Sequence, residues 1–166
     1  MMMANVGGLP TNIHATGLLY RGRGLLLRGA PGAGKSFLAL SLLEKGEGED
    51  PPACLVGDDR IDLSRRHGCL YMQGPAVLAG KIELFGRGIL SRPFMQGAPV
   101  DLVVDLLDTP TRMPEAGEWE TRILDVPVSR CPVPVFPLVS TAHQMMLIAA
   151  ALADFPGHPP AGTGSP

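Results

Sequence analysis

One eight-residue segment constrains this chain more than any other part of the sequence. Residues 29–36 read GAPGAGKS and match the pattern G-x-x-x-x-G-K-[ST]. The apolar run 24–28 precedes them, and residues 36–44 (SFLALSLLE) follow with apolar side chains on adjoining helical rows. The sequence therefore predicts a strand, a glycine-rich loop and a helix in succession, which is the context in which this pattern binds phosphate.

Each residue type in this segment suits a phosphate site. Glycines let successive backbone N–H groups point inward, and the helix that follows adds its positive N-terminal end. The ammonium of Lys35, expected on an exposed loop, can reach the β- and γ-phosphates of a nucleotide, and the Ser36 hydroxyl can ligate a bridging magnesium ion. The expected nucleotide-binding residues are Gly29, Ala30, Pro31, Gly32, Ala33, Gly34, Lys35 and Ser36.

Two carboxylates follow the next apolar run. Residues 53–57 (ACLVG) precede Asp58 and Asp59, and the segment 46–52 (GEGEDPP) before them has the composition of a loop. In a phosphate-binding unit, such a strand brings carboxylates next to the loop. Two roles are open to them, as magnesium ligands or as a base that takes the proton of an attacking hydroxyl. A charged turn that simply ends a strand is the alternative.

The rest of the chain predicts an α/β fold with a mixed sheet and few helices. Short apolar or alternating segments are separated by Gly and Pro clusters, and we expect strands at 69–73, 81–85, 100–107, 120–126 and 133–139. Residues 141–153 are rich in strong helix formers, and Ser140 or Thr141 can cap the first turn of a helix there.

The length of 166 residues is that of one domain. We expect a catalytic unit at 13–154, preceded by an extension at 1–12. Residues 155–166 are dominated by Gly and Pro and are expected to form a disordered tail.

Composition excludes several classes of protein. The net charge of −2 offers no basic surface for nucleic acid. Cys54, Cys69 and Cys131 form no C-x-x-C pair, so we expect buried, reduced cysteines rather than disulfides or a zinc site. No leader-like segment and no long apolar run is present. We therefore expect a cytoplasmic protein with no nucleic-acid or membrane partner.

Four segments in this order resemble the C-terminal catalytic domain of the HPr kinase/phosphorylases. They are Ile13-His14, GAPGAGKS at 29–36, LVGDDRIDL at 55–63 and AGKIELFGRGIL at 79–90, within a resemblance that covers 13–152. It implies a P-loop fold of the HPr kinase/PEP carboxykinase type. Enzymes of this family use ATP to phosphorylate a serine of the small phosphocarrier HPr, and they remove that phosphate with inorganic phosphate. The resemblance also implies a hexamer that regulates a phosphotransferase system.

The resemblance assigns roles to single residues. It implies four catalytic residues, His14, Lys35, Asp58 and Arg122. It makes Asp58 the acid/base and implies two magnesium ligands, Ser36 and Glu83. On the sequence alone, Glu83 would be an outward-facing strand residue between two apolar neighbours. The cofactors implied are ATP and Mg²⁺, and the implied partner is an HPr-like carrier.

The sequence departs from the family pattern at three places. The usual N-terminal domain is missing, which predicts a short form, and the loop 46–52 is extra. The late basic segment P-V-[RK]-P-G-R-N aligns with 134–140 (PVFPLVS), where Phe136 and Val139 replace the basic residues. Because the family links that segment to dephosphorylation, we expect the phosphorylase activity to be weak.

Two other functions remain open. One is a P-loop small-molecule kinase, although the chain has no recognisable arginine-rich lid. The other is a nucleotide-binding regulatory module without turnover, which would be favoured if Asp58 or Glu83 lay away from the phosphate site.

Overall fold

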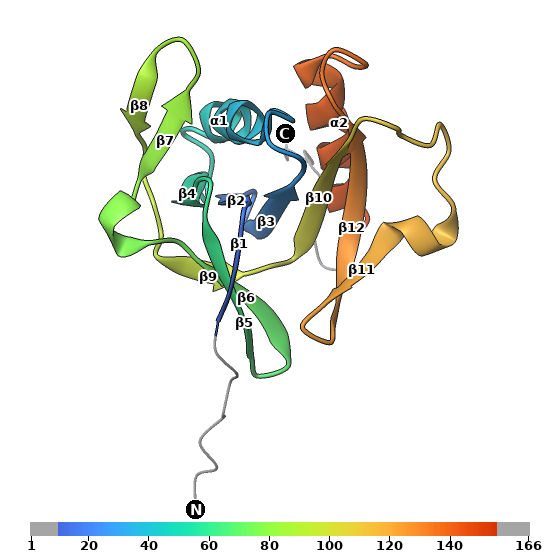
Figure 1. Cartoon of the computed structure of the whole chain (residues 1–166), viewed down its shortest axis with the longest axis horizontal. Coiled ribbons are helices and arrows are strands. Elements are labelled where there is room, and N and C mark those ends of the chain that lie inside the picture. The colour runs from blue at the N-terminus through green and yellow to red at the C-terminus, as the bar shows by residue number, and fades with distance from the viewer. Residues whose placement is uncertain (1–9, 156–166) are drawn as a thin grey trace, which may run out of the picture.

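A mixed six-stranded sheet forms the centre of the computed structural model, which describes residues 10–155 (Figure 1). Its order is β11-β12-β10-β3-β2-β4. The strands are β2 (Thr16–Tyr20), β3 (Arg23–Arg28), β4 (Cys54–Gly57), β10 (Leu102–Leu107), β11 (Glu120–Ile123) and β12 (Val126–Pro134). β3, β10 and β12 are parallel, and the outer strands pair antiparallel.

Two helices cover one face of this sheet and a second sheet covers the other. The helices are α1 (Lys35–Lys45) and α2 (Thr141–Ala153), with 3-10 turns at Ala76–Leu78 and Ala116–Trp119. The second, antiparallel sheet contains β1 (Thr11–Ile13), β5 (Ile61–Arg66), β6 (Cys69–Gln73) and β9 (Gly97–Pro99). β7 (Lys81–Leu84) and β8 (Gly88–Ser91) form a hairpin beside α1.

The alternation of β10 shows how the layers are held together. Leu102, Val104 and Leu106 pack in the apolar cluster that contains the helices. Val103 points to the opposite face, into the cluster shared with the second sheet. A strand that is buried on both faces carries a continuous apolar run, and LVVDLL is such a run apart from Asp105.

The parallel strands determine where the functional loops lie. The carboxyl ends of β3, β10 and β12 meet at one edge of the sheet, which lies at the top in Figure 1. Three connections leave from this edge: the predicted phosphate loop after β3, the segment 108–119 after β10, and the turn 135–139 after β12. The carboxyl ends of parallel strands are a common position for ligand sites in α/β folds.

The structure confirms the predicted fold class and several elements. The strand at 69–73 and the helix at 141–153 have the predicted bounds. Ser140 caps that helix, since its side-chain oxygen accepts a hydrogen bond from the backbone N–H of His143 at 3.1 Å.

Two predicted strands near the C-terminus have wrong bounds. The segment 120–126 is interrupted, because Leu124 and Asp125 adopt φ of 49° and 61° and form a tight turn between β11 and β12. The strand expected at 133–139 is the end of β12, which stops at Pro134 and is followed by a turn.

Two further expectations are corrected. Thr11 and Asn12 do not belong to an extension, because β1 pairs them with β5, and Asn12 Nδ2 donates to Asp62 Oδ1 at 2.8 Å. Residues 1–9 of the expected extension and 156–166 of the expected tail lie outside the described residues, but Phe155, the first residue of that tail, packs against the helix-side apolar cluster. Cys69 is exposed, because it lies on the outward side of β6, whereas Cys131 is buried.

In residues 10–155, neither helix is long and apolar enough to cross a membrane.

Candidate active site

The segment 29–36 connects β3 to α1 as predicted. Gly32 and Gly34 adopt φ of 79° and 96°, and Gly34 is the N-cap residue of α1. A Cβ atom at either position would meet nothing within 4 Å. These glycines are therefore required by the left-handed backbone of the loop rather than by lack of space.

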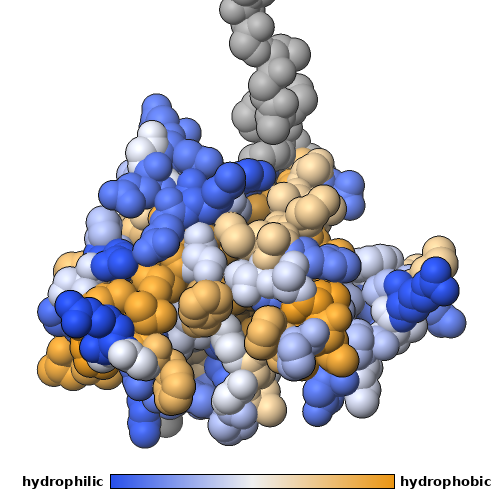
Figure 2. All heavy atoms as spheres, turned by 90° about the horizontal axis from the view of Figure 1, so that it is seen from above, coloured by the Kyte–Doolittle hydropathy of each residue, from blue (hydrophilic) through white to orange (hydrophobic). Residues whose placement is uncertain are grey.

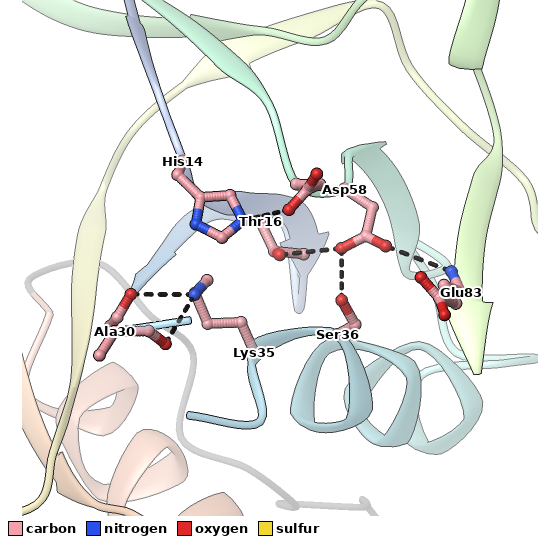
Figure 3. Close-up of polar contacts among 9 residues, drawn as sticks. His14, Thr16, Ala30, Lys35, Ser36, Asp58 and Glu83 are labelled. Atoms are coloured by element: carbon pink, nitrogen blue, oxygen red, sulfur yellow. Dashed lines mark hydrogen bonds and ion pairs between the residues drawn. The ribbon is translucent and has the colours of Figure 1, made fainter. Parts of the chain in front are cut away.

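Lys35 is the first residue of α1, and its side chain folds back under the loop. Its ammonium donates to the backbone oxygens of Gly29 at 2.9 Å and Ala30 at 3.3 Å, as Figure 3 shows. The expectation of an exposed lysine is wrong, because only 6% of its surface is accessible. Burial lowers the pKa of Lys35 below its ordinary value, and the charges of Asp59 and Asp58 act in the opposite direction.

Asp58 is the centre of the polar network beside this loop (Figure 3). Its Oδ1 accepts hydrogen bonds from the hydroxyl of Ser36 at 2.7 Å and from the hydroxyl of Thr16 at 3.0 Å. Its Oδ2 accepts one from the backbone N–H of Glu83 at 3.2 Å. The Asp58 carboxylate, which follows the end of β4, is therefore bonded to three other elements: the first turn of α1, the start of β2 and the β7–β8 hairpin.

Asp59 turns away from Asp58 and pairs with His14. His14 Nε2 and Asp59 Oδ1 are in hydrogen-bonding contact, and both side chains are solvent-accessible. Asp59 has a positive φ of 70°, a conformation that Asp tolerates better than most residues. His14 thus lies next to the acidic segment, although 45 positions separate the two in the sequence.

Glu83 reaches the site through its backbone. Its neighbour Ile82 is buried in the helix-side cluster, and the Glu83 side chain is exposed, as strand alternation indicates. Among the described residues, the Glu83 carboxylate makes no hydrogen bond or ion pair. Its role as a magnesium ligand therefore stays a prediction.

Arg122 lies far from this network within the chain. It is on β11, which is separated from β3 by β12 and β10. Arg122 pairs with Pro127 of β12. The registers of β12 with β10 and of β10 with β3 place this pair level with the start of β3, at the end of the sheet opposite to the phosphate loop. Arg112, which the sequence analysis did not single out, is in the segment that leaves β10 at the loop's own edge.

The residue before the phosphate loop is held by a second network. Arg28 Nε and Nη2 donate to the two carboxylate oxygens of Asp105 at 2.8 and 2.9 Å, and Arg130 Nε donates to Oδ2 at 2.6 Å. Burial alone raises the pKa of Asp105, but the hydrogen bonds and charges of both arginines outweigh it and hold the pKa below its usual value. This network joins β3, β10 and β12 just before Gly29.

The oxygen atoms of the site fit a magnesium–nucleotide complex. A hydroxyl and a carboxylate are the hard oxygen ligands that Mg²⁺ prefers, and a loop Ser with a strand-end Asp is the pair that P-loop enzymes use. The described residues contain no cluster of three His, Cys, Asp or Glu side chains that could hold a metal by themselves. In proteins Mg²⁺ is usually held by one or two carboxylates together with the phosphates of the substrate.

Comparison with known proteins identifies similar domains. The HPr kinase/phosphorylase of Clostridium acetobutylicum is 28% identical over 160 residues, covering 87% of this chain and 48% of that protein. That of Lactiplantibacillus plantarum is 29% identical over 154 residues, covering 86% and 46%. The structure of the HPr(Ser) kinase/phosphatase from Coxiella burnetii matches with a TM-score of 0.68 at 27% identity, covering 86% of this chain and 94% of that one.

The chain spans about half the length of the curated relatives that it matches. The family model described as the HPr serine kinase C-terminal domain matches residues 9–156, which include both helices, the two larger sheets, the β7–β8 hairpin and every residue of the site. This chain therefore belongs to the HPr serine kinase C-terminal domain family.

Proposed function

We propose that this chain is the catalytic domain of an ATP-dependent serine kinase that acts on HPr or an HPr-like phosphocarrier and so regulates a phosphotransferase system. One observation carries the proposal: the hydroxyl of Ser36 lies 2.7 Å from Asp58 Oδ1. This contact links the phosphate loop to Asp58 at the end of β4. The residues expected to bind the nucleotide and the expected proton acceptor therefore belong to one hydrogen-bond network. The names of the similar proteins supply the substrate.

The loop residues bind and orient the nucleotide. Backbone N–H groups of a P-loop hold the phosphates, and the Lys35 ammonium exchanges its bonds to the Gly29 and Ala30 oxygens for bonds to phosphate. Ser36 and, by resemblance, Glu83 would hold Mg²⁺, which would supply positive charge to the phosphates of the nucleotide. Asp58 accepts a hydrogen bond from the Ser36 hydroxyl, so the oxygen lone pairs of Ser36 remain available for the metal.

Asp58 is placed to receive the proton of the substrate serine. The serine oxygen bonds to the γ-phosphorus, the bond from that phosphorus to the bridging oxygen of ADP breaks, and the serine proton passes to the carboxylate. His14, paired with Asp59 beside Asp58, belongs to this proposal as an active-site histidine. Arg122 enters it only as a residue from a neighbouring subunit, because within one chain it lies at the other end of the sheet.

A hexamer in the cytoplasm is part of the same proposal. Its support is the family resemblance together with exposed large apolar side chains, among them Phe85 at 97%, Phe136 at 69% and Met146 at 73%. Figure 2 shows hydrophobic areas between hydrophilic ones on one face of the molecule. Exposed apolar surface of this kind is common where protein partners bind.

The test is phosphorylation of a purified HPr-like carrier with magnesium and labelled ATP. The wild type is expected to label a serine of the carrier, and Asp58→Asn is expected to lower that rate by about 10²- to 10⁴-fold, because the proton acceptor is lost. ADP affinity measured without magnesium is the control. It should be similar in both proteins, since the loop backbone and Lys35 are unchanged.

Other outcomes distinguish the alternatives. Tight nucleotide binding without labelling of any carrier or of any small hydroxyl compound would favour a regulatory module, although the contact between Asp58 and Ser36 argues against one. Label found only in a small molecule would favour a small-molecule kinase. Full activity in Asp58→Asn would refute the role of Asp58.

We predict that this kinase is much faster in the forward direction than in phosphorolysis. Attack by inorganic phosphate requires a second multiply charged anion beside the phosphoserine, and repulsion makes its binding weak unless cations are near. The turn 135–139 after β12 leaves the sheet at the phosphate-loop edge, and it carries Phe136 and Val139 where the family has basic residues. Initial rates with ATP, and with phosphate on the phosphorylated carrier, measure the ratio.

Similar rates in both directions would show that another cation supplies the missing charge, such as Arg60, two residues after Asp58, or Arg87, in the turn between β7 and β8. A matched gain-of-function variant strengthens this test. Val139→Arg should raise the rate of phosphorolysis more than the rate of phosphorylation. An increase of both rates by the same factor would contradict the charge argument.

A further inference from the structure

Thr16 has a buried hydroxyl whose hydrogen-bond partner is the carboxylate of the candidate site. The residue is fully buried, between the buried Ala15 and Gly17 at the start of β2. Its Oγ1 donates to Asp58 Oδ1 at 3.0 Å (Figure 3). A hydroxyl removed from water is unfavourable unless it is hydrogen-bonded, and valine would fill the same volume without that requirement. Packing alone therefore gives no reason for a threonine here.

An irregularity in strand pairing brings Thr16 and Asp58 together. β2 and β4 pair with Leu18 opposite Leu55, but the register shifts so that Gly17 lies opposite Gly57. Continuing the shifted register places Thr16 opposite Asp58, on the face of the sheet that α1 covers. Without the shift, Thr16 would be opposite Gly57. β-bulges commonly re-aim a side chain next to an active site, and this one aims Thr16 at Asp58.

The contact makes the two oxygens of Asp58 unequal. Oδ1 receives two hydroxyl donors, Ser36 and Thr16, so both of its lone-pair directions are used. Oδ2 receives only the backbone N–H of Glu83, at the longer distance of 3.2 Å. The remaining lone pair of Asp58 is therefore on Oδ2.

We infer that Thr16 is a positioning residue for Asp58, and this inference rests on the proposed kinase function. Thr16 fixes Oδ1 against Ser36 and leaves Oδ2 as the atom that takes the proton of the substrate serine. Thr16 touches neither substrate nor nucleotide, and it acts only through the orientation of the carboxylate. The same orientation keeps the Ser36 lone pairs directed toward the metal.

The experiment compares Thr16→Val, which removes the hydroxyl at nearly constant shape, with Thr16→Ser, which keeps it. Thr16→Val is expected to lower kcat for the carrier by about 10- to 100-fold, because small misplacements of a catalytic group have effects of this size. The KM for the carrier should not change. Thr16→Ser should have a kcat near that of the wild type. Thr121→Val, the same chemical change on β11, should leave kcat unchanged.

A second readout does not depend on the kinase reaction. ADP affinity is measured with and without Mg²⁺, and the increase caused by Mg²⁺ reports how well Asp58 holds Ser36. Thr16→Val should reduce this increase, Thr16→Ser should preserve it, and the affinity without Mg²⁺ should be the same in all variants. Thermal unfolding of each variant shows whether the fold is kept.

Three results would overturn the inference. They are wild-type behaviour of Thr16→Val, equal impairment of Thr16→Ser and Thr16→Val, and a loss of ADP affinity without Mg²⁺ in Thr16→Val. The first two would mean that the hydroxyl does not act on Asp58, and the third that the substitution disturbs the loop itself. If the wild type labels no carrier, the proposed function fails, and the effect of Mg²⁺ on ADP affinity alone decides the role of Thr16.

Discussion

Replacing Lys35 with methionine is expected to lower phosphoryl transfer by about 10²- to 10³-fold while leaving the fold as stable as the wild type. The activity falls because the transition state loses a positive charge placed at the transferred phosphoryl group, and removal of one such group has effects of this size. The stability is kept for a different reason. Burial lowers the pKa of Lys35, so the folded state disfavours the charge that methionine removes.

Methionine retains the unbranched apolar stem that fills the space under the loop. The substitution leaves the backbone oxygens of Gly29 and Ala30 without the ammonium, but Ala30 is exposed, so water can replace the lost hydrogen bond there. Lys45→Met is the matched control, since Lys45 is exposed in the last turn of the same helix. Transfer rates and chemical denaturation are measured for all three proteins. Unchanged turnover in Lys35→Met would refute the assigned role, and a loss of stability would show that the bonds to Gly29 and Ala30 matter more than the burial of charge.

The parts of the site that could be predicted are those that depend only on contiguous residues. A strand, a glycine-rich loop and a helix follow one another without a break, so the motif at 29–36 specifies its own context. The backbone at Gly32 and Gly34 is left-handed, a conformation that favours glycine, so the glycines of the motif are the sequence signal of this loop. Helix α2 was equally predictable, because its cap at Ser140 and its helix-forming residues are contiguous.

The parts that could not be predicted depend on pairing between distant segments. Thr16 and Asp58 are 42 positions apart, and their contact follows from a one-residue shift between β2 and β4 that no local pattern signals. The position of Arg122 also depends on pairing between distant strands. The sequence does not say that β12 and β10 lie between β11 and β3, so the family resemblance places Arg122 at a site that it does not reach within the chain.

The burial of Lys35 cannot be predicted from the motif for a related reason. The motif specifies which residue carries the charge but not which way the side chain turns, and the structure has it bonded to the loop's own carbonyls. Asp105 has no sequence signal of its own, because it lies inside an apolar run, where a single carboxylate looks like an interruption of a strand. Its partners, Arg28 and Arg130, come from the two neighbouring strands.

Asp105→Asn is expected to destabilise the fold by about 3 kcal/mol at neutral pH. Removing one partner of a buried ion pair leaves the other charge uncompensated, with typical losses of about 3 to 5 kcal/mol. Here two guanidinium groups would lose their shared carboxylate, whose side chain is only 12% exposed. The lower end of the range applies, because the side chain of Arg28 is 32% exposed and water can compensate part of its charge.

The pH dependence of this difference identifies its cause. Because the folded-state pKa of Asp105 is lowered from the ordinary value of 3.8, its stabilising contribution is present above that value and is lost as the pH falls through the folded-state pKa. The free energies of unfolding of wild type and Asp105→Asn should therefore differ most near neutral pH and converge in acid. Asp125→Asn, a change of the same chemistry in an exposed turn, should shift stability by no more than about 0.5 kcal/mol. A difference between wild type and Asp105→Asn that stays constant down to the acid limit would mean that packing, and not charge, holds Arg28 and Arg130 beneath the phosphate loop.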